Sequence, residues 1–210
     1  MKTRKPGAYS TKIAHAAECA FQRAIIQGGT STVKGEKITW IDIELPVYGD
    51  KSRGKCIDLI GKDSKGNYVL CELKFRKKRD SGGPKEATEQ LKEYYSYIQK
   101  NADDLNSMNL MHENAKEKKI DWKKVAAQTT RLFVVANSFY WDTWLILSKK
   151  KEKLDDKDVE YYSVNIDRYV FEKQKGKNTT YTPQMPPEGM VWEEKHVRRE
   201  RRRKSVKKCV

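Results

Sequence analysis

The sequence lacks the features that mark a secreted protein, a protein with a structural zinc site or a membrane-spanning protein. Its four cysteines, Cys19, Cys56, Cys71 and Cys209, form no C-x-x-C pair and no cluster with zinc-site spacing. No apolar run approaches the ~20 residues needed to cross a bilayer, and the first residues carry no apolar signal segment. These absences favour a reduced, cytoplasmic protein without membrane attachment.

Apolar residues are also scarce, at 37% of the 210-residue chain, whereas charged residues reach 35%. This balance predicts a compact core under a heavily charged surface. The formal charge of +15 attracts polyanions, of which nucleic acid is the commonest. The excess is uneven, because residues 195–210 hold nine basic side chains and a single acid, Glu200. The rest of the chain is therefore only moderately basic.

Hydrophobic periodicity predicts one mixed α/β domain over residues 1–175 and an extended basic tail over 176–210. Helices are expected over 10–27, 86–99 and 141–147, with irregular helix over 101–128. Gly28-Gly29 ends the first of these helices, and Pro84 precedes the second. Strands are expected over 37–48, 55–62, 67–75, 131–136 and 161–172. The first of these should be half-buried, and the second and third should form a hairpin.

Charged residues interrupt the two apolar strands of the expected hairpin. Residues 56–60 read Cys-Ile-Asp-Leu-Ile, and residues 70–75 read Leu-Cys-Glu-Leu-Lys-Phe. Side chains alternate across a strand, so Glu72 and Lys74 share a face, and the hairpin can bring Asp58 beside Glu72. Two carboxylates and an ammonium on one sheet face are costly unless a ligand uses them. An exposed ion pair near a strand-ending aspartate is the alternative.

A magnesium ion would use such a group, because Mg²⁺ prefers carboxylate, carbonyl and water oxygens. Asp58, Glu72 and the backbone carbonyl of Cys71 are the expected ligands. The metal would lower the pKa of a bound water and offset charge on a scissile phosphate. Lys74 would orient the attacking water and stabilise the developing negative charge. We expect Mn²⁺ to substitute for Mg²⁺.

The spacing of these residues resembles that of a known family. Asp58, thirteen intervening residues and then Glu72-Leu73-Lys74 resemble the D…(D/E)-x-K signature of the PD-(D/E)XK nucleases, with Ile57 in place of the motif's proline. The resemblance covers residues 10–170. It implies an α/β fold with a restriction-endonuclease-like core, in which a central mixed β-sheet is flanked by helices. It also implies metal-dependent hydrolysis of phosphodiester bonds, in DNA rather than RNA.

Two flanking features extend the resemblance. Gln90-Leu91-Lys92-Glu93-Tyr94 resembles the Q-h-x-x-Y motif of RecB-like members, which implies that Gln90 and Tyr94 act at the site. A surface glutamine and a core tyrosine are the alternative. Glu18 interrupts the apolar stripe of the first helix, and the family implies that it helps to hold metal; a lysine partner at the edge of the core is the alternative. RecB-like members can use a first-helix histidine as a metal ligand, but His15, one turn from Glu18, is expected to face solvent instead.

Two basic segments are candidates for binding phosphates. Arg76, Lys77, Lys78 and Arg79 directly follow the strand of Lys74, where they could position a nucleic-acid backbone without reading its sequence. The candidate residues of the tail are Arg198, Arg199, Arg201, Arg202, Arg203 and Lys204. The alternatives are a solvated loop and a disordered tail.

The predicted function is therefore that of a metal-dependent nuclease acting on DNA. A non-catalytic nucleic-acid-binding protein is the first alternative. A basic protein-interaction module is the second, and it leaves the interrupted strands unexplained. The sequence leaves open whether the cleavage is endo- or exonucleolytic, which strands and sequences are preferred, the biological pathway and whether the chain forms a homodimer.

Overall fold

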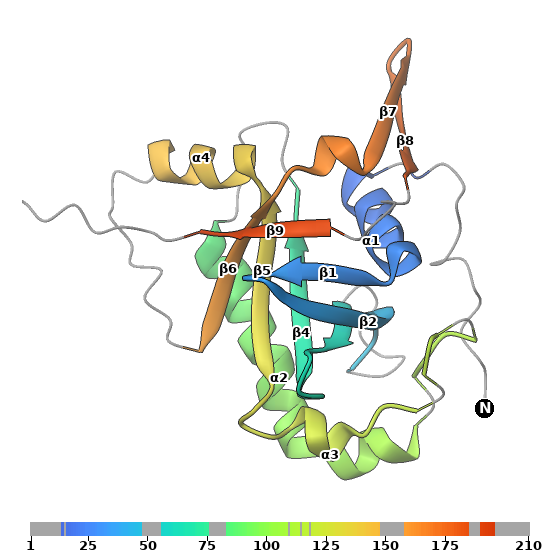
Figure 1. Cartoon of the computed structure of the whole chain (residues 1–210), viewed down its shortest axis with the longest axis vertical. Helices are drawn as coiled ribbons and strands as arrows, with labels where there is room; N and C mark the ends of the chain where they lie inside the picture. The colour runs from blue at the N-terminus through green and yellow to red at the C-terminus, as the bar shows by residue number, and fades with distance from the viewer. Residues whose placement is uncertain are drawn as a thin grey trace, which may run out of the picture.

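The computed structural model describes residues 14, 16–47, 56–75, 83–108, 110–113, 115–117, 119–147, 158–184 and 190–195 (Figure 1). Its helices are α1 (Ala17–Gly28), α2 (Pro84–Ser107), α3 (Trp122–Val125), α4 (Ser138–Leu147) and the 3-10 turn η3 (Ile166–Arg168). Its strands are β1 (Thr30–Val33), β2 (Glu36–Leu45), β3 (Ile57–Lys62), β4 (Tyr68–Lys74), β5 (Arg131–Asn137), β6 (Val159–Val164), β7 (Val170–Lys175), β8 (Asn178–Pro183) and β9 (Met190–Glu194).

Seven of these strands close into a mixed barrel in the order β1-β2-β3-β4-β5-β6-β9, while β7 and β8 form a separate two-stranded sheet. The strand β9 closes the barrel because it pairs in parallel with β1 on one edge and antiparallel with β6 on the other. The predicted restriction-endonuclease-like core, an open central sheet flanked by helices, is therefore wrong. The closing strand comes from residues 176–210, which were expected to form an extended tail.

The long strand β2 curves the barrel wall. Its pairing with β3 shifts register between Trp40 and Asp42, and such a bulge increases local twist and bend. Trp40 enters one hydrophobic cluster and Ile41 the other, so both faces of β2 are buried, unlike the half-buried strand that alternation predicts. Gly61 pairs with Trp40, and a Cβ there would lie 2.7 Å from Trp40 Cε3. A glycine is needed at this close approach.

An inner hydrophobic cluster fills the barrel. Every barrel strand contributes to it, from Val33 on β1 to Trp192 on β9. Trp192 stacks on Trp40, with ring centroids 5.3 Å apart. Helix α1 packs Phe21 and Ile25 into the same cluster. This packing fixes α1 against the barrel, and with it the polar residues on the same helix.

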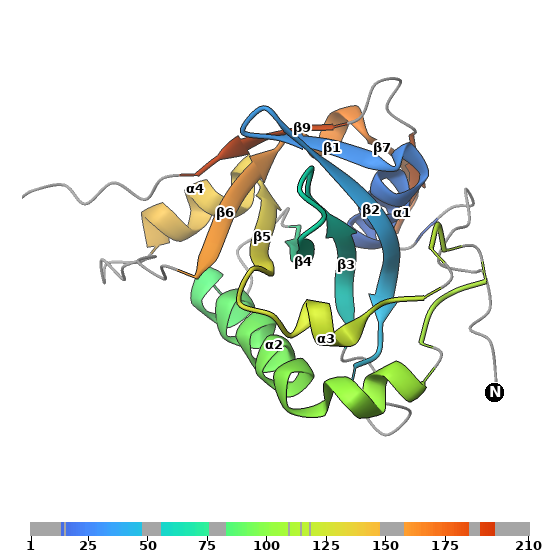
Figure 2. The ribbon, with the colours of Figure 1, turned by 60° about the horizontal axis from the view of Figure 1, so that its bottom comes forward.

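A second cluster lies between the barrel wall and the helices α2, α3 and α4. Leu70 and Val134 of the wall meet Leu91 and Tyr94 of α2 in this cluster, and Figure 2 shows α2 and α3 running beneath the barrel strands. Pro84 occupies the first turn of α2, where its missing N–H costs nothing. The backbone of α2 is non-helical at Asn101 (φ −126°, ψ 21°), two residues beyond the predicted end at residue 99, and a second helical segment continues to Ser107. Leu105 of that segment is buried in the same cluster, so packing holds it against the wall.

A buried polar contact ties β2 to the segment that follows α2. Asp42 accepts hydrogen bonds of 2.9 Å from the backbone N–H groups of Ile43 and His112. Its Oδ1 also lies 2.9 Å from Nδ1 of His112. Both side chains are buried, so these bonds offset the cost of removing Asp42 from water. The loop after α2 is thereby held against the barrel.

Several predicted elements are confirmed and others are wrong. The end of the first helix is confirmed, because Gly29 caps α1 in the left-handed region at φ 76°. The predicted single strand 161–172 is wrong in its continuity, because β6 covers its first residues and ends at Val164, and η3 turns the chain before β7 begins. The strands β1, β8 and β9 were not predicted. None of the described helices is both long and apolar enough to span a membrane.

Candidate active site

The β3–β4 hairpin brings Asp58, Glu72 and Lys74 together, as the strand pattern predicts. Leu59 pairs with Cys71, so the next residues along the two strands, Asp58 and Glu72, are neighbours. Alternation places Cys71 in the inner cluster, whereas Glu72 and Lys74 project from the other face of β4. The carboxylates therefore stand where the paired part of the hairpin ends.

Asp58 is fixed by two hydrogen bonds from different elements. Its Oδ2 accepts the backbone N–H of Leu73 at 2.7 Å, so the side chain takes an N–H of the neighbouring strand. Its Oδ1 accepts Nε2 of Gln22 on α1 at 2.8 Å. Gln22 is buried and was not predicted as a site residue. Its position one helical turn after Glu18 was the available signal, because residues at i and i+4 share a helix face.

Glu72 is buried, but only one of its two carboxylate oxygens has a described hydrogen-bond partner. Its side chain is 2% exposed, and its Oε1 accepts the ammonium of Lys74 at 2.6 Å. Its Oε2 is buried and has no hydrogen-bond partner among the described residues. A buried carboxylate oxygen without a partner loses solvation that nothing replaces. This atom is the strongest sign in the described structure that the group contacts a ligand.

Glu18 joins the group from helix α1. Its Oε2 accepts the backbone N–H of Phe75, one residue beyond β4, at 3.0 Å. Among the described residues Glu18 forms no ion pair with a lysine, and its side chain is half-buried. The helix brings a third carboxylate to the end of the strand that carries Glu72 and Lys74.

Burial controls the charge of these groups. It raises the pKa of Glu72 to about 7, against the opposing effect of Lys74 and with a further contribution from Glu18. Burial, followed by the charges of Glu72 and Glu18, raises the pKa of Asp58 well above its usual range, and burial also raises the pKa of Glu18. Burial acts to lower the pKa of Lys74, but the neighbouring carboxylates outweigh it and the net shift is upward. Among the described residues three acids thus share the ammonium of Lys74, and a further cation would favour their ionised forms.

Gln90 and Tyr94 lie together on α2. Nε2 of Gln90 donates to the Tyr94 hydroxyl at 2.9 Å. Burial raises the pKa of Tyr94, and the charges of Glu72 and Asp58 raise it further while Gln90 opposes the shift. The hydroxyl is therefore within electrostatic reach of the two carboxylates, although the ring belongs to the second cluster.

The raised pKa of Glu72 makes stability depend on pH. Its folded pKa of about 7 exceeds the ordinary 4.5, so its contribution to folding is fully present below pH 4.5 and is lost as the pH rises through 7. In the Glu72→Gln variant the glutamine side chain is neutral at every pH. We expect it to raise the free energy of unfolding by up to about 3 kcal/mol at about pH 8, and to have little effect near pH 4.5.

Urea unfolding in EDTA at several pH values between these limits measures the difference. Glu89→Gln is the matched control, because Glu89 lies on α2 with its side chain 66% exposed. A stability difference for Glu72→Gln that does not change with pH would contradict the raised pKa.

The donor chemistry fits a hard divalent cation. Glu72, Asp58 and Glu18 offer carboxylate oxygens, which Mg²⁺ and Mn²⁺ prefer. As they stand, no described group of three or more His, Cys, Asp and Glu side chains is arranged to hold a metal ion. Glu72 Oε2 is without a partner, whereas both oxygens of Asp58 already accept hydrogen bonds. The fit therefore rests on the kind of donors and on Glu72 in particular.

The remaining predicted site residues are placed as follows. Cys71, whose carbonyl was expected to bind metal, lies within the barrel wall in register with Leu59 and Phe133. His15 and both predicted phosphate-binding segments lie outside the described residues. These segments are Arg76, Lys77, Lys78 and Arg79 after β4, and Arg198, Arg199, Arg201, Arg202, Arg203 and Lys204 in the tail.

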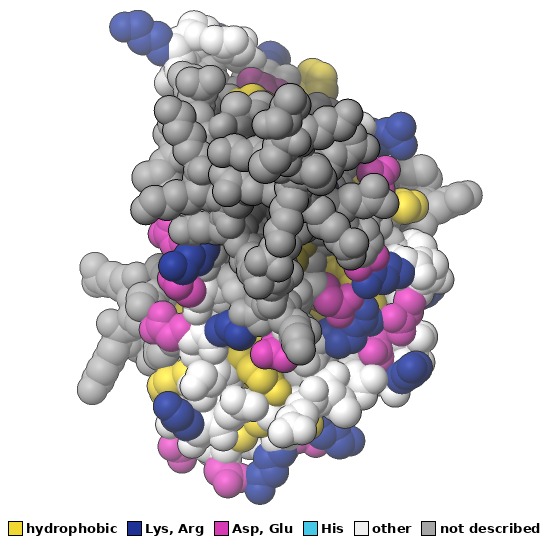
Figure 3. Space-filling view, turned by 90° about the vertical axis from the view of Figure 1, so that its left-hand side faces the viewer, with side chains coloured by type: hydrophobic (Ala, Val, Ile, Leu, Met, Phe, Trp, Pro, Cys, Tyr) yellow, Lys and Arg dark blue, Asp and Glu magenta, His cyan; other side chains and the backbone are white. Residues whose placement is uncertain are grey.

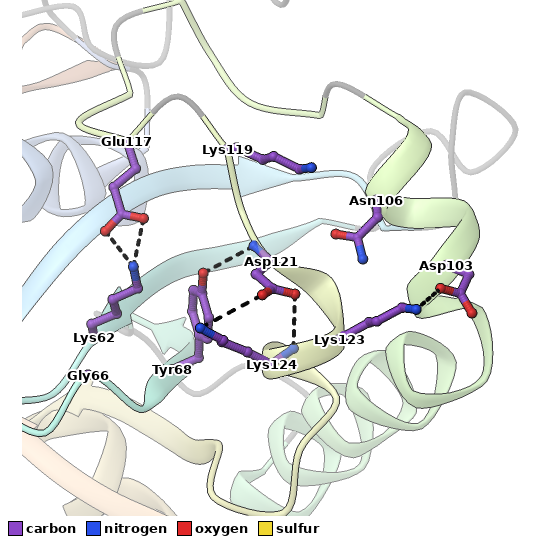
Figure 4. Close-up of a pocket in the computed structure, with 10 residues that line it drawn as sticks. All are labelled: Lys62, Gly66, Tyr68, Asp103, Asn106, Glu117, Lys119, Asp121, Lys123 and Lys124. Atoms are coloured by element: carbon purple, nitrogen blue, oxygen red, sulfur yellow. Dashed lines mark hydrogen bonds and ion pairs between the residues drawn. The ribbon is translucent and has the colours of Figure 1, made fainter.

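A polar cleft of about 610 Å³ lies at the other end of β4 (Figure 4). Tyr68, the first residue of that strand, lines it. Lysines of this cleft are paired with acids: Lys62 with Glu117 at 2.7 Å, and Lys123 with Asp103 at 2.6 Å. The cleft is thus separate from the Glu72 group, and the pairing reduces its attraction for an anion.

Comparisons of the chain with protein-family models, with curated proteins and with solved structures give no match. No relative therefore supplies a substrate, a metal or a catalytic residue. What the site can do is inferred from its own side chains.

Proposed function

We propose that the chain is a metal-dependent nuclease that hydrolyses phosphodiester bonds in DNA, with a catalytic group of the PD-(D/E)XK type carried on a closed barrel. The observation that carries the proposal is the buried carboxylate of Glu72. One of its oxygens is held by Lys74 and the other has no described partner, while Asp58 stands beside it. Carboxylates that are buried together are costly, and a divalent cation offsets that cost.

In this proposal each side chain has a separate task. Bound Mg²⁺ would supply an activated water and offset negative charge on the phosphate. Glu72 and Asp58 would hold the ion through their oxygens. Lys74, whose ammonium is kept charged by its neighbours, would stabilise the negative charge that develops on the phosphate. Gln22 and the Leu73 N–H orient Asp58, and the Phe75 N–H orients Glu18.

A non-catalytic nucleic-acid-binding protein is the second candidate. It is favoured by the hydrogen bonds that already occupy both oxygens of Asp58 and by the absence of a ready metal-binding group among the described residues. In that case the Glu72–Lys74 pair would be structural. We propose the cytoplasm as the compartment for either function, which suits the free thiols of Cys19, Cys56 and Cys71.

Cleavage assays with and without metal separate the two candidates. We expect the purified chain to cut plasmid and linear DNA with Mg²⁺ or Mn²⁺ and to lose all cleavage in excess EDTA. Ca²⁺ should bind but support about 100-fold less cleavage or none, because it accepts looser geometry and activates its water poorly. Undiminished cleavage in EDTA would overturn the metal mechanism, and DNA binding without cleavage in any metal would support the second candidate.

Removal of residues 196–210 tests the role expected for the tail. This truncation keeps β9, which ends at Glu194, so the barrel should fold. DNA binding should weaken and its salt dependence should flatten, because fewer counterions are released. Cleavage at low salt should remain within about tenfold of the full chain, since Glu72 and Lys74 are retained. Fluorescence anisotropy over a range of salt concentrations measures the slope, and an unchanged slope would contradict the expected role.

A further inference from the structure

The β7–β8 hairpin projects from the barrel as an isolated ribbon (Figure 1). Its strands pair from Val170 and Pro183 at the base to Lys175 and Asn178 at the tip. At about 3.3 Å per residue each strand is about 20 Å long. Beyond the base the ribbon pairs with no other strand among the described residues, except through the bridge of Ala14 to β8.

The two faces of the ribbon differ. One face turns toward the body of the protein: Val170 and Pro183 are buried at its base, and Tyr181 packs against the inner cluster. The other face, here called the lysine face, comprises Phe171, Lys173, Lys175, Asn178, Thr180 and Thr182. Phe171 is 55% exposed there. Lys173, Lys175 and Asn178 of this face are also exposed, whereas Thr180 and Thr182 are half-buried. Packing therefore does not explain the exposed lysines and Phe171.

The lysine face and the turn form a basic surface. Lys173, Lys175 and Lys177 are exposed, and the only acidic side chain of the hairpin, Glu172, belongs to the opposite face. No described residue forms an ion pair with any of the three lysines. Figure 3 shows lysine side chains at the tip of the hairpin, at the top of the molecule. These charges differ from those of the polar cleft, where lysines are paired with acids.

We propose that the β7–β8 ribbon binds in the major groove of B-form DNA. That groove is about 12 Å wide and admits a two-stranded ribbon. The lysines suit the phosphates that flank the groove, and Phe171 suits apolar contact with thymine methyl groups. The threonine hydroxyls suit base edges, that of Thr180 as an acceptor, because it already donates to the carbonyl of Lys173 at 3.1 Å. The major groove of an RNA duplex is too deep and narrow for such a ribbon, which favours DNA as the partner.

The ribbon is mechanically tied to the candidate active site. Ala14 exchanges backbone hydrogen bonds of 2.7 and 2.9 Å with Tyr181 of β8, and helix α1, which carries Glu18 and Gln22, begins three residues later. A duplex held by the ribbon would thus be held by an element attached to α1. This orienting role rests on the proposed nuclease function, whereas DNA binding by the ribbon does not.

The test compares two triple variants in a Glu72→Gln background, in EDTA, so that no cleavage is needed. The ribbon variant carries Lys173→Ala, Lys175→Ala and Lys177→Ala. The control carries Lys119→Ala, Lys123→Ala and Lys124→Ala at the polar cleft, which removes the same charge. Fluorescence anisotropy measures binding to a DNA duplex, an RNA duplex of the same sequence and a single DNA strand. Melting temperatures confirm the fold, and if that of the ribbon variant falls, the single Lys175→Glu variant replaces it.

We expect the ribbon variant to bind the DNA duplex about 10- to 100-fold more weakly, with a salt slope reduced by about 3. The control variant, and binding to the other two probes, should change less than about threefold by the same argument. Unchanged duplex binding, an equal loss in both variants, or an equal loss on all probes would overturn the proposal. If the ribbon variant loses duplex binding but the unsubstituted chain does not cleave DNA with any metal, the ribbon proposal stands and the nuclease proposal is refuted. If the unsubstituted chain cleaves DNA but the ribbon variant keeps its duplex binding, only the ribbon proposal is refuted.

Discussion

Glu72→Gln and Asp58→Asn should each lower the rate of metal-dependent DNA cleavage by about 10³-fold, the effect expected when a preorganised polar group at the reacting centre is lost. Both variants remove a carboxylate charge and keep the side-chain shape. In the Asp58→Asn variant the remaining amide oxygen can still accept one of the two hydrogen bonds that hold Asp58. Both variants should also bind Mn²⁺ more weakly, which calorimetry measures independently of cleavage.

Lys74 should show a different pattern, because an ammonium is not a metal ligand. Lys74→Ala should lower cleavage by about 10²-fold or more while Mn²⁺ binding persists. This variant also leaves Glu72 buried without its partner, so it should lose stability. Lys74→Arg keeps a positive charge opposite Glu72. It should preserve the melting temperature and still lose most activity, because a planar guanidinium does not reproduce an ammonium point charge.

Cleavage rate and melting temperature must be measured on the same preparations. Glu89→Gln and Lys85→Ala serve as controls, because both residues are exposed on α2 and should leave both quantities unchanged. Full activity in a folded Glu72→Gln or Lys74→Arg protein would refute the assigned roles. A folded variant that loses activity while the controls keep it would support them.

Trp192→Ala should lower the free energy of unfolding by about 4 kcal/mol, the usual cost of truncating a large buried aromatic side chain. Trp192 is 2% exposed on the strand that closes the barrel. Its ring stacks on Trp40 and lies 6.4 Å from Phe133 and 6.3 Å from Tyr162, between ring centroids. Removing the indole would leave a cavity in the barrel between β9 and the strands β2, β5 and β6, which are far from it in sequence.

Two further substitutions on β9 make this prediction specific. Val191→Ala alters the neighbouring residue, which is 64% exposed, and should cost less than about 0.5 kcal/mol. Trp192→Phe keeps an aromatic ring and removes an indole N–H that has no described partner; it should cost about 1.5 kcal/mol or less. Urea unfolding measures all three variants. If Trp192→Ala were no more costly than Val191→Ala, β9 would not be part of the barrel wall in solution.

The sequence by itself was sufficient to predict the hairpin that carries the candidate site. Alternation along β4 placed Glu72 and Lys74 on one face, and the turn signal between the strands brought Asp58 beside them. These features depend on residues that are near one another in the chain, so local periodicity contains the information. The same is true of the end of α1 at Gly29 and of the start of α2 at Pro84.

Only the tertiary structure decided how the barrel closes and how the carboxylates are charged. β9 has five residues, and its partners β1 and β6 lie far away in the sequence, so local periodicity cannot assign its pairing. The contact of Gln22 with Asp58 and the raised pKa of Glu72 likewise depend on how α1 and the hairpin pack together. Desolvation is set by everything that surrounds a side chain, and those surroundings exist only once distant segments have come together.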